Sequence, residues 1–155
     1  MARTYQVTAV TRAVNRIARG LTSLGIGPKN NHVLTVTGRS SGLARSTPVS
    51  LVIEGGKRWL VAPYGEVAWV QNARAAGRVT LARGKTSEVV PITELGPAES
   101  APVLKAYVTN VRITRPYFDV RPDSQVEAFA AEAPRHPVFL IGPAYGPPAG
   151  GGPNE

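Results

Sequence analysis

The chain has 155 residues and a mass of 16.4 kDa, the size of one domain, with no room for a second. It has no cysteine, so thiol nucleophiles, disulfides, iron–sulfur clusters and cysteine-ligated zinc are excluded. Its formal net charge is +8, and no acidic residue precedes Glu54. The basic N-terminal third indicates an anionic partner: a nucleic acid, an acidic membrane surface or a small phosphorylated ligand.

Residues 1–28 predict a basic amphipathic helix. Apolar residues recur from Val7 to Leu24 at alternating spacings of three and four, with arginines on the opposite side. Gly25 and Gly27 end the pattern. Three interpretations stay open: a helix packed on the core, a helix lying on an anionic membrane, or an arginine-rich presequence.

Residues 29–142 predict one α+β unit rich in hairpins. Strand-type runs occupy residues 33–37, 46–53, 59–62, 79–82, 88–92 and 138–141. Helical segments are expected at residues 67–76, 97–112 and 124–133. In the last of them, Ser124 is the expected N-cap and Glu127 takes the capping-box position. Clustered hairpins favour a barrel or curled antiparallel sheet over a Rossmann fold. Residues 143–155, rich in Gly and Pro, are expected to form a flexible tail.

The segment from Thr37 to Pro48 carries the strongest local signal. A strand ends there in a glycine-bounded loop that holds two arginines and two serines. Amides in such a turn bind anions, and the guanidinium fork fits phosphate oxygens. A plain hairpin loop with solvated arginines is the alternative interpretation.

A second segment, residues 62–72, runs from a strand end through Pro63 and Gly65 into a helix. The amides at the start of that helix are suited to an anionic ligand. Trp69 there is either the wall of an aromatic ligand or a core anchor. Tyr117 likewise either faces a pocket or packs against the protein.

Taken together, these segments resemble the split-barrel oxidoreductases that depend on the deazaflavin coenzyme F-420, in particular their nitroreductase-type branch. The resemblance covers about residues 30–141 and rests on segments 34–42, 45–49 and 60–63, on Gly55-Gly56, Trp69 and Asn72. It implies a split antiparallel β-barrel with peripheral helices. It also implies hydride transfer to an electron-poor acceptor, such as an activated alkene, an enone, a quinone or a nitroaromatic. Such a coenzyme supplies the reactive groups, so no thiol, metal or triad is needed.

The resemblance also assigns roles to residues. The phosphate and acidic tail of the coenzyme would be bound by Arg39, Ser40, Ser41, Gly42 and Arg45. The deazaflavin ring would be bordered by Thr47, Pro48, Val49, Ala62, Pro63, Tyr64, Ala68 and Trp69. The acceptor would lie against Tyr117 and Phe118, and Tyr117 or solvent would supply the proton. Family members often carry lysine at the positions of Ser40 and Tyr64, so this chain has two cations fewer.

The alternatives to this function are an FMN-binding split-barrel oxidoreductase and a non-catalytic protein of lipid or membrane surfaces. No nucleic-acid partner is expected, because the basic residues are not interleaved with aromatic ones. The chain is expected to act in the cytoplasm on a small-molecule acceptor, as a monomer or homodimer. The N-terminal helix would be its contact with an anionic membrane surface.

Overall fold

The structure is a computed structural model that describes residues 29–145. The helix predicted within residues 1–28 and most of the predicted tail lie outside the described residues. The described strands are β1 (Asn31–Thr37), β2 (Ala44–Glu54), β3 (Lys57–Val61), β4 (Arg78–Arg83), β5 (Thr86–Glu94) and β6 (Val138–Ile141). The α-helices are α2 (Ala68–Ala76), α3 (Pro97–Asn110) and α4 (Val126–Glu132), with 3₁₀ helices η1 (Arg115–Tyr117) and η2 (Ala133–Arg135).

The six strands close into an antiparallel barrel in the order β1-β2-β3-β6-β5-β4. Three pairs, β1–β2, β2–β3 and β4–β5, are hairpins between consecutive strands. The barrel closes through long-range pairs: β6 lies between β3 and β5, and β1 pairs with β4. The predicted class, an α+β split antiparallel barrel with peripheral helices, is confirmed for the described part of the chain.

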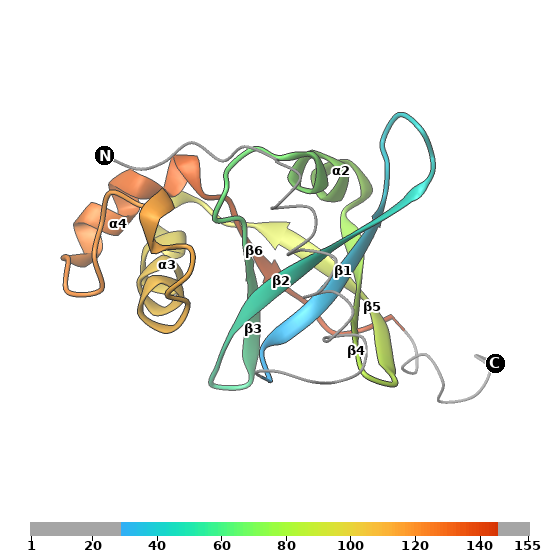
Figure 1. The fold of residues 1–155 in the computed structure, drawn as a ribbon, viewed down its shortest axis with the longest axis horizontal. Coiled ribbons are helices and arrows are strands. Elements are labelled where there is room, and N and C mark those ends of the chain that lie inside the picture. Colours follow the sequence, from blue (N-terminus) through green and yellow to red (C-terminus); the bar gives the residue numbers. More distant parts are fainter. Residues whose placement is uncertain (1–28, 146–155) are drawn as a thin grey trace.

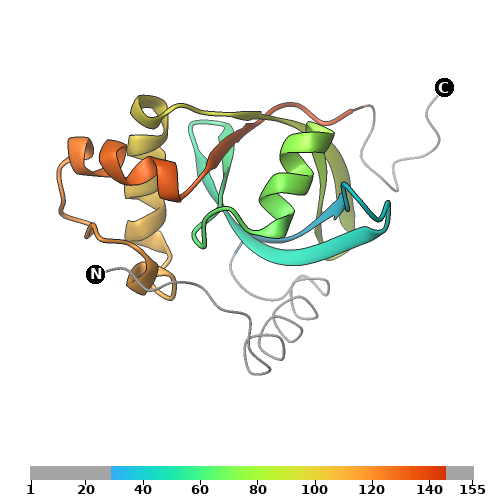
Figure 2. The ribbon, with the colours of Figure 1, turned by 90° about the horizontal axis from the view of Figure 1, so that it is seen from above.

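Alternate residues of the strands fill the barrel with apolar side chains. Leu34, Leu60 and Phe139 are among those that are almost completely buried there. Helix α2 lies across one end of the barrel (Figure 2), where Val70 and Ala73 are fully buried against the same core. The barrel core thus fixes α2 beside the ends of β1 and β3.

A second core lies outside the barrel, on the side of β2, β3 and β6 (Figure 1). Helices α3 and α4 pack there on the outward-facing Val52, Val61 and Val138. None of the described helices is long and apolar enough to cross a membrane. The second core places Phe118, which follows η1, against His136, which precedes β6.

Two details of the helices differ from the predictions. Ser124 is not an N-cap: α4 begins at Val126 after Gln125, which makes no side-chain capping bond. The hydroxyl of Ser124 instead accepts a hydrogen bond from the backbone N–H of Arg121 at 2.9 Å, because a serine hydroxyl can serve a turn as readily as a helix. Helix α3 ends at Asn110, two residues before its predicted end.

Candidate functional site

The loop between β1 and β2 is a compact turn that needs its glycines. The N–H of Gly38 donates to the carbonyl of Leu43 at 2.8 Å, and that of Gly42 donates to the carbonyl of Gly38 at 2.9 Å. Gly42 has a φ of +72°, which favours glycine. A Cβ on Gly38 would lie 2.6 Å from the hydroxyl oxygen of Ser41. The chain therefore folds back on itself within six residues and brings Arg39, Ser40 and Ser41 to its tip.

Arg39 joins this loop to helix α2. The Oδ1 atom of Asn72 accepts hydrogen bonds from the backbone N–H of Arg39 at 3.0 Å and from its Nη1 at 2.7 Å. Asn72 is buried on α2, so its amide is a fixed anchor. Both residues stand out in the sequence, but their separation of 33 residues hides this contact.

The rest of the loop is open to a ligand. Ser40, Ser41 and Arg45 are exposed. Within residues 29–145, the backbone N–H groups of Ser40 and Ser41 have no acceptor, and Arg45 contacts no carboxylate. Open amides beside two guanidinium groups fit an anion such as a phosphate.

The start of α2 adds further donors. Its N-cap, Val67, offers no side-chain acceptor, and its first turn has no acidic residue, so the first amides are open to an anionic or polar ligand. Trp69 is half-buried, and its ring packs on Phe139 with the centroids 6.3 Å apart. Trp69 is therefore at least in part a core anchor. Ala68 beside it is exposed.

The expected ring-bordering residues lie on two neighbouring strands. Thr47, Pro48 and Val49 form the half-buried middle of β2, which pairs with β3 further along. After β3, Ala62 is buried, and its N–H donates to the carbonyl of Pro137 at 2.9 Å. The structure thus brings the two expected segments to adjoining parts of one sheet.

Tyr117 and Phe118, the two residues expected to face the acceptor, have different surroundings. Tyr64 and Tyr117 are half-buried and meet edge to face, with ring centroids 4.8 Å apart. Phe118 is only 6% exposed, and its ring stacks on that of His136 with the centroids 3.9 Å apart. Phe118 is a core residue, so its expected contact with an acceptor is not supported, whereas Tyr117 remains at the surface beside Tyr64.

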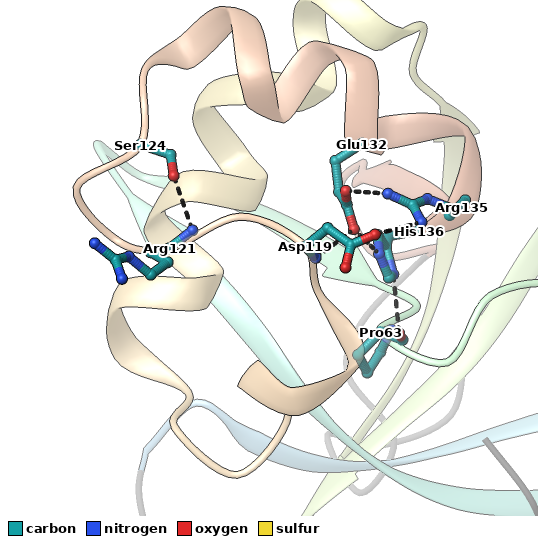
Figure 3. Close-up of polar contacts among 7 residues, drawn as sticks. All are labelled: Pro63, Asp119, Arg121, Ser124, Glu132, Arg135 and His136. Atoms are coloured by element: carbon teal, nitrogen blue, oxygen red, sulfur yellow. Dashed lines mark hydrogen bonds and ion pairs between the residues drawn. The ribbon is translucent and has the colours of Figure 1, made fainter. Parts of the chain in front are cut away.

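His136 and Glu132 were not singled out as site residues in the sequence, yet they form a buried polar pair next to Pro63 (Figure 3). His136 Nδ1 donates to the carbonyl of Pro63 at 2.9 Å, and its Nε2 lies 2.8 Å from Glu132 Oε2. Burial lowers the pKa of His136, and the neighbouring Glu132 opposes that effect. The sequence signal was the four-residue spacing of Glu132 and His136 at the end of a predicted helix.

Other hollows of the surface lie elsewhere. One of about 690 Å³ is on the outer face of β1, β4 and β5. It is lined by Thr37, Ala76, Arg78, Thr80, Val89 and Tyr145, none of which was an expected site residue. Residues 29–145 contain no cluster of His, Asp or Glu suited to a metal ion.

Comparison with known proteins identifies a matching family. A sequence model of a family described as F420H(2)-dependent quinone reductase matches residues 5–121. No curated protein sequence matches the chain.

Solved structures share the fold. A reductase described as F420-H2 dependent (FDR-A) has 25% identity and a TM-score of 0.53, covering 74% of this chain and 95% of its own. A protein described as a domain-swapped dimer has 23% identity and a TM-score of 0.55, covering 86% and 96%. General Stress Protein 26 from Bacillus anthracis has 12% identity and a TM-score of 0.51, covering 83% and 89%.

Proposed function

The chain belongs to the F420H(2)-dependent quinone reductase family, and we propose that it transfers a hydride from reduced coenzyme F420 to a small electron-poor acceptor. It is a deazaflavin-dependent oxidoreductase, and coenzyme F420 is its cofactor. The acceptor we propose is a quinone or another compound with an activated double bond, such as an enone. A nitroaromatic is the third class of acceptor that we propose.

The observation that carries this proposal is the open anion site at the β1–β2 loop. Arg45 and the amides of Ser40 and Ser41 would bind the phosphate and acidic tail of the coenzyme. Arg39 would add a second cation, held in place by Asn72. Such charge-assisted bonds are about twice as strong as neutral ones, so this corner would supply much of the binding free energy.

The remaining residues would orient the ring and exclude water. The middle of β2, with Pro48 at its centre, and the turn at Pro63 and Tyr64 would border the ring. The bound coenzyme supplies the hydride. Tyr117, in contact with Tyr64, would pack against the acceptor and hold a hydroxyl proton near its developing negative charge.

The central test is a titration of the purified protein with oxidised coenzyme F420, followed by fluorescence quenching. We expect Arg39→Ala and Arg45→Ala each to weaken binding by about 1.5–3 kcal/mol. Arg112→Ala is the matched control, because Arg112 is an exposed arginine remote from the loop. Unchanged affinity in both loop variants would reject the site.

A parallel titration with FMN separates the two flavin-type cofactors. Tight FMN binding together with no F420 binding would reject the proposed cofactor chemistry for this chain. The homodimer, suggested by the neighbour described as a domain-swapped dimer, is tested by light scattering of the same samples. The proposed contact with anionic membranes rests on residues 1–28 and is tested by vesicle sedimentation with and without that segment.

A further inference from the structure

The turn between β3 and α2 is joined to the segment around His136 by two hydrogen bonds and one close approach of the backbones. His136 Nδ1 donates to the Pro63 carbonyl at 2.9 Å. The N–H of Ala62 donates to the Pro137 carbonyl at 2.9 Å. At Gly65, an added Cβ would lie 3.2 Å from the carbonyl oxygen of Arg135. Only the first of these contacts depends on a side chain, so His136 is where a substitution can release the turn.

The same histidine is attached to the segment that carries Tyr117. Its ring stacks on Phe118 at 3.9 Å. The Oε2 atom of Glu132, which faces His136, also accepts a hydrogen bond from the backbone N–H of Asp119 at 3.1 Å. Arg135 bridges the carboxylates of Glu132 and Asp119 from the outer side (Figure 3). Residues 118–119 are therefore held by the same pair of buried side chains.

The chemistry of this cluster fixes the orientation of the ring. A carbonyl only accepts hydrogen bonds, so Nδ1 of His136 must carry a proton toward Pro63. Nε2 lies 2.8 Å from Glu132 Oε2, so it donates to that carboxylate when the ring carries its second proton. Both side chains are at most 4% exposed, so water cannot easily replace either bond if it is lost.

We propose that His136 is a positioning residue of the reductase site: with Glu132 it locks Tyr64, on the barrel side, against Tyr117, on the helical side. The inference rests on the proposed function, in which Tyr64 borders the ring of the coenzyme and Tyr117 packs against the acceptor. Their ring centroids are 4.8 Å apart. Tyr64 follows Pro63, which accepts the hydrogen bond from His136, and Tyr117 precedes Phe118, which stacks on the His136 ring. The pair thus sets the position of Tyr64 relative to Tyr117 without touching coenzyme or acceptor.

Two variants test this. His136→Phe keeps a ring to stack on Phe118 and removes both hydrogen bonds. Glu132→Gln keeps the side-chain volume, but its single acceptor oxygen cannot replace both carboxylate oxygens, so at least one tether is weakened. Glu132→Gln also tests the inference if His136→Phe fails to fold. Val103→Ala is the matched control, because Val103 is buried in the same core cluster but has no part in these bonds.

The kinetic readout is steady-state reduction of a soluble quinone at saturating coenzyme, with every variant kept well below its unfolding temperature. We expect His136→Phe to raise the KM for the quinone by roughly tenfold or more, because small misplacements of binding groups have large effects. The dissociation constant for coenzyme should change less than it does in Arg45→Ala. Glu132→Gln should raise the KM by a smaller factor, and Val103→Ala should leave it unchanged.

The second readout needs neither coenzyme nor acceptor. Amide hydrogen exchange of the protein alone should accelerate in His136→Phe in two separate segments, residues 62–67 and 117–121. In Val103→Ala any acceleration should follow global stability and be spread over the helical core. Acceleration confined to residues 132–136 in the histidine variant would overturn the inference, as would an unchanged KM.

The two proposals fail in different ways. If the wild-type protein does not bind coenzyme F420, the proposed function is lost, while hydrogen exchange still shows whether His136 joins the two segments. If the wild-type protein binds and reduces the quinone but the variants match Val103→Ala in both readouts, only the positioning role is lost.

Discussion

Arg39 and Arg45 lie near one another in sequence but have different surroundings. The guanidinium of Arg39 is hydrogen-bonded to Asn72 at 2.7 Å, whereas that of Arg45 has no acidic partner within residues 29–145. Arg39 therefore orders the loop as well as contributing charge, while Arg45 contributes charge alone. Substituting them should have different consequences for the protein without ligand.

The first residue-scale prediction concerns Asn72. Asn72→Ala removes the acceptor of both Arg39 bonds, so the loop should lose its fixed position and coenzyme binding should weaken by about 1–2 kcal/mol. In the double variant with Arg39→Ala the losses should not add, and the cycle should give a coupling of about 1 kcal/mol. Fluorescence titration of the four proteins measures it. Full additivity would show that Asn72 does not act through Arg39.

The second residue-scale prediction concerns Ser40, which is exposed at the tip of the loop. Ser40→Lys adds a cation beside the open amides, so coenzyme affinity should rise by about 0.5–1 kcal/mol. The gain should shrink at high salt, because screening weakens exposed charge pairs. Titrations at low and high ionic strength check both statements, with Ser124→Lys, remote from the loop, as the control. A gain that is independent of salt would contradict an electrostatic cause.

At the scale of residues, the sequence predicted the chemical type of the site residues better than it predicted which residues contact one another. The glycine-bounded loop with its arginines was foreseen from composition and spacing. The bond from Arg39 to Asn72 was not, because it joins residues 33 apart in the chain. For a similar reason Phe118 was expected to face the acceptor and its stacking on His136 was not foreseen. Whether an aromatic side chain faces a ligand or a neighbouring ring depends on packing that a single segment does not encode.

At the scale of elements, the strands and hairpins followed from local patterns. Alternating β-branched runs and glycine turns predicted the β2–β3 and β4–β5 hairpins, because the turn residues adopt positive φ at Gly55, Gly56 and Gly84. The start of α4 was less predictable. Ser124 satisfied the pattern of an N-cap, but its hydroxyl serves the preceding turn instead.

The element-scale prediction concerns two prolines in α3. Pro97 is at the first position of the helix, where a backbone N–H would have no partner within the helix, so its absence from proline costs little. Pro102 lies inside the helix. Pro102→Ala should restore the bond to the carbonyl of Ala98 and raise the free energy of unfolding by about 1 kcal/mol. Pro97→Ala, the matched control, should be neutral or slightly destabilising. Urea denaturation compares them, and equal effects would contradict the positional argument.

At the scale of the whole molecule, closure of the barrel was the least predictable feature. β6 completes the sheet between β3 and β5 although it follows them by more than 40 residues. The apolar run at residues 138–141 predicted a buried strand but not the strands that it pairs with. Hydrophobic periodicity indicates which residues are buried, not which strands lie side by side. The same closure brings His136, the residue two before β6, beneath the turn at Pro63.

The fold also sets how stability depends on pH, because it half-buries His32 and buries His136. Burial lowers the pKa of His32 and of His136 below the ordinary value of 6.5. Between the lowered pKa values and about 6.5 the unfolded chain binds more protons than the folded one, so the free energy of unfolding rises with pH. Stability should therefore be complete above about pH 6.5 and fall as the pH drops below it.

The carboxylates act in a separate range of pH. Arg74 lowers the pKa of Glu66, and Arg58 lowers that of Glu88, in both cases from an ordinary value of 4.5. Their contribution is present above about pH 4.5 and is lost only at lower pH. A decline between pH 7 and 5 is thus assigned to the histidines.

Urea unfolding at about pH 7.5 and about pH 5.5 measures this decline. We expect a lower free energy of unfolding at the lower pH, because protons bound by the unfolded histidines pull the equilibrium toward the unfolded chain. His32→Asn should make the difference smaller, since Asn does not titrate and His32 lies away from the Glu132 cluster. Equal stability of the wild-type protein at the two pH values would show that neither histidine is held unprotonated in the folded barrel.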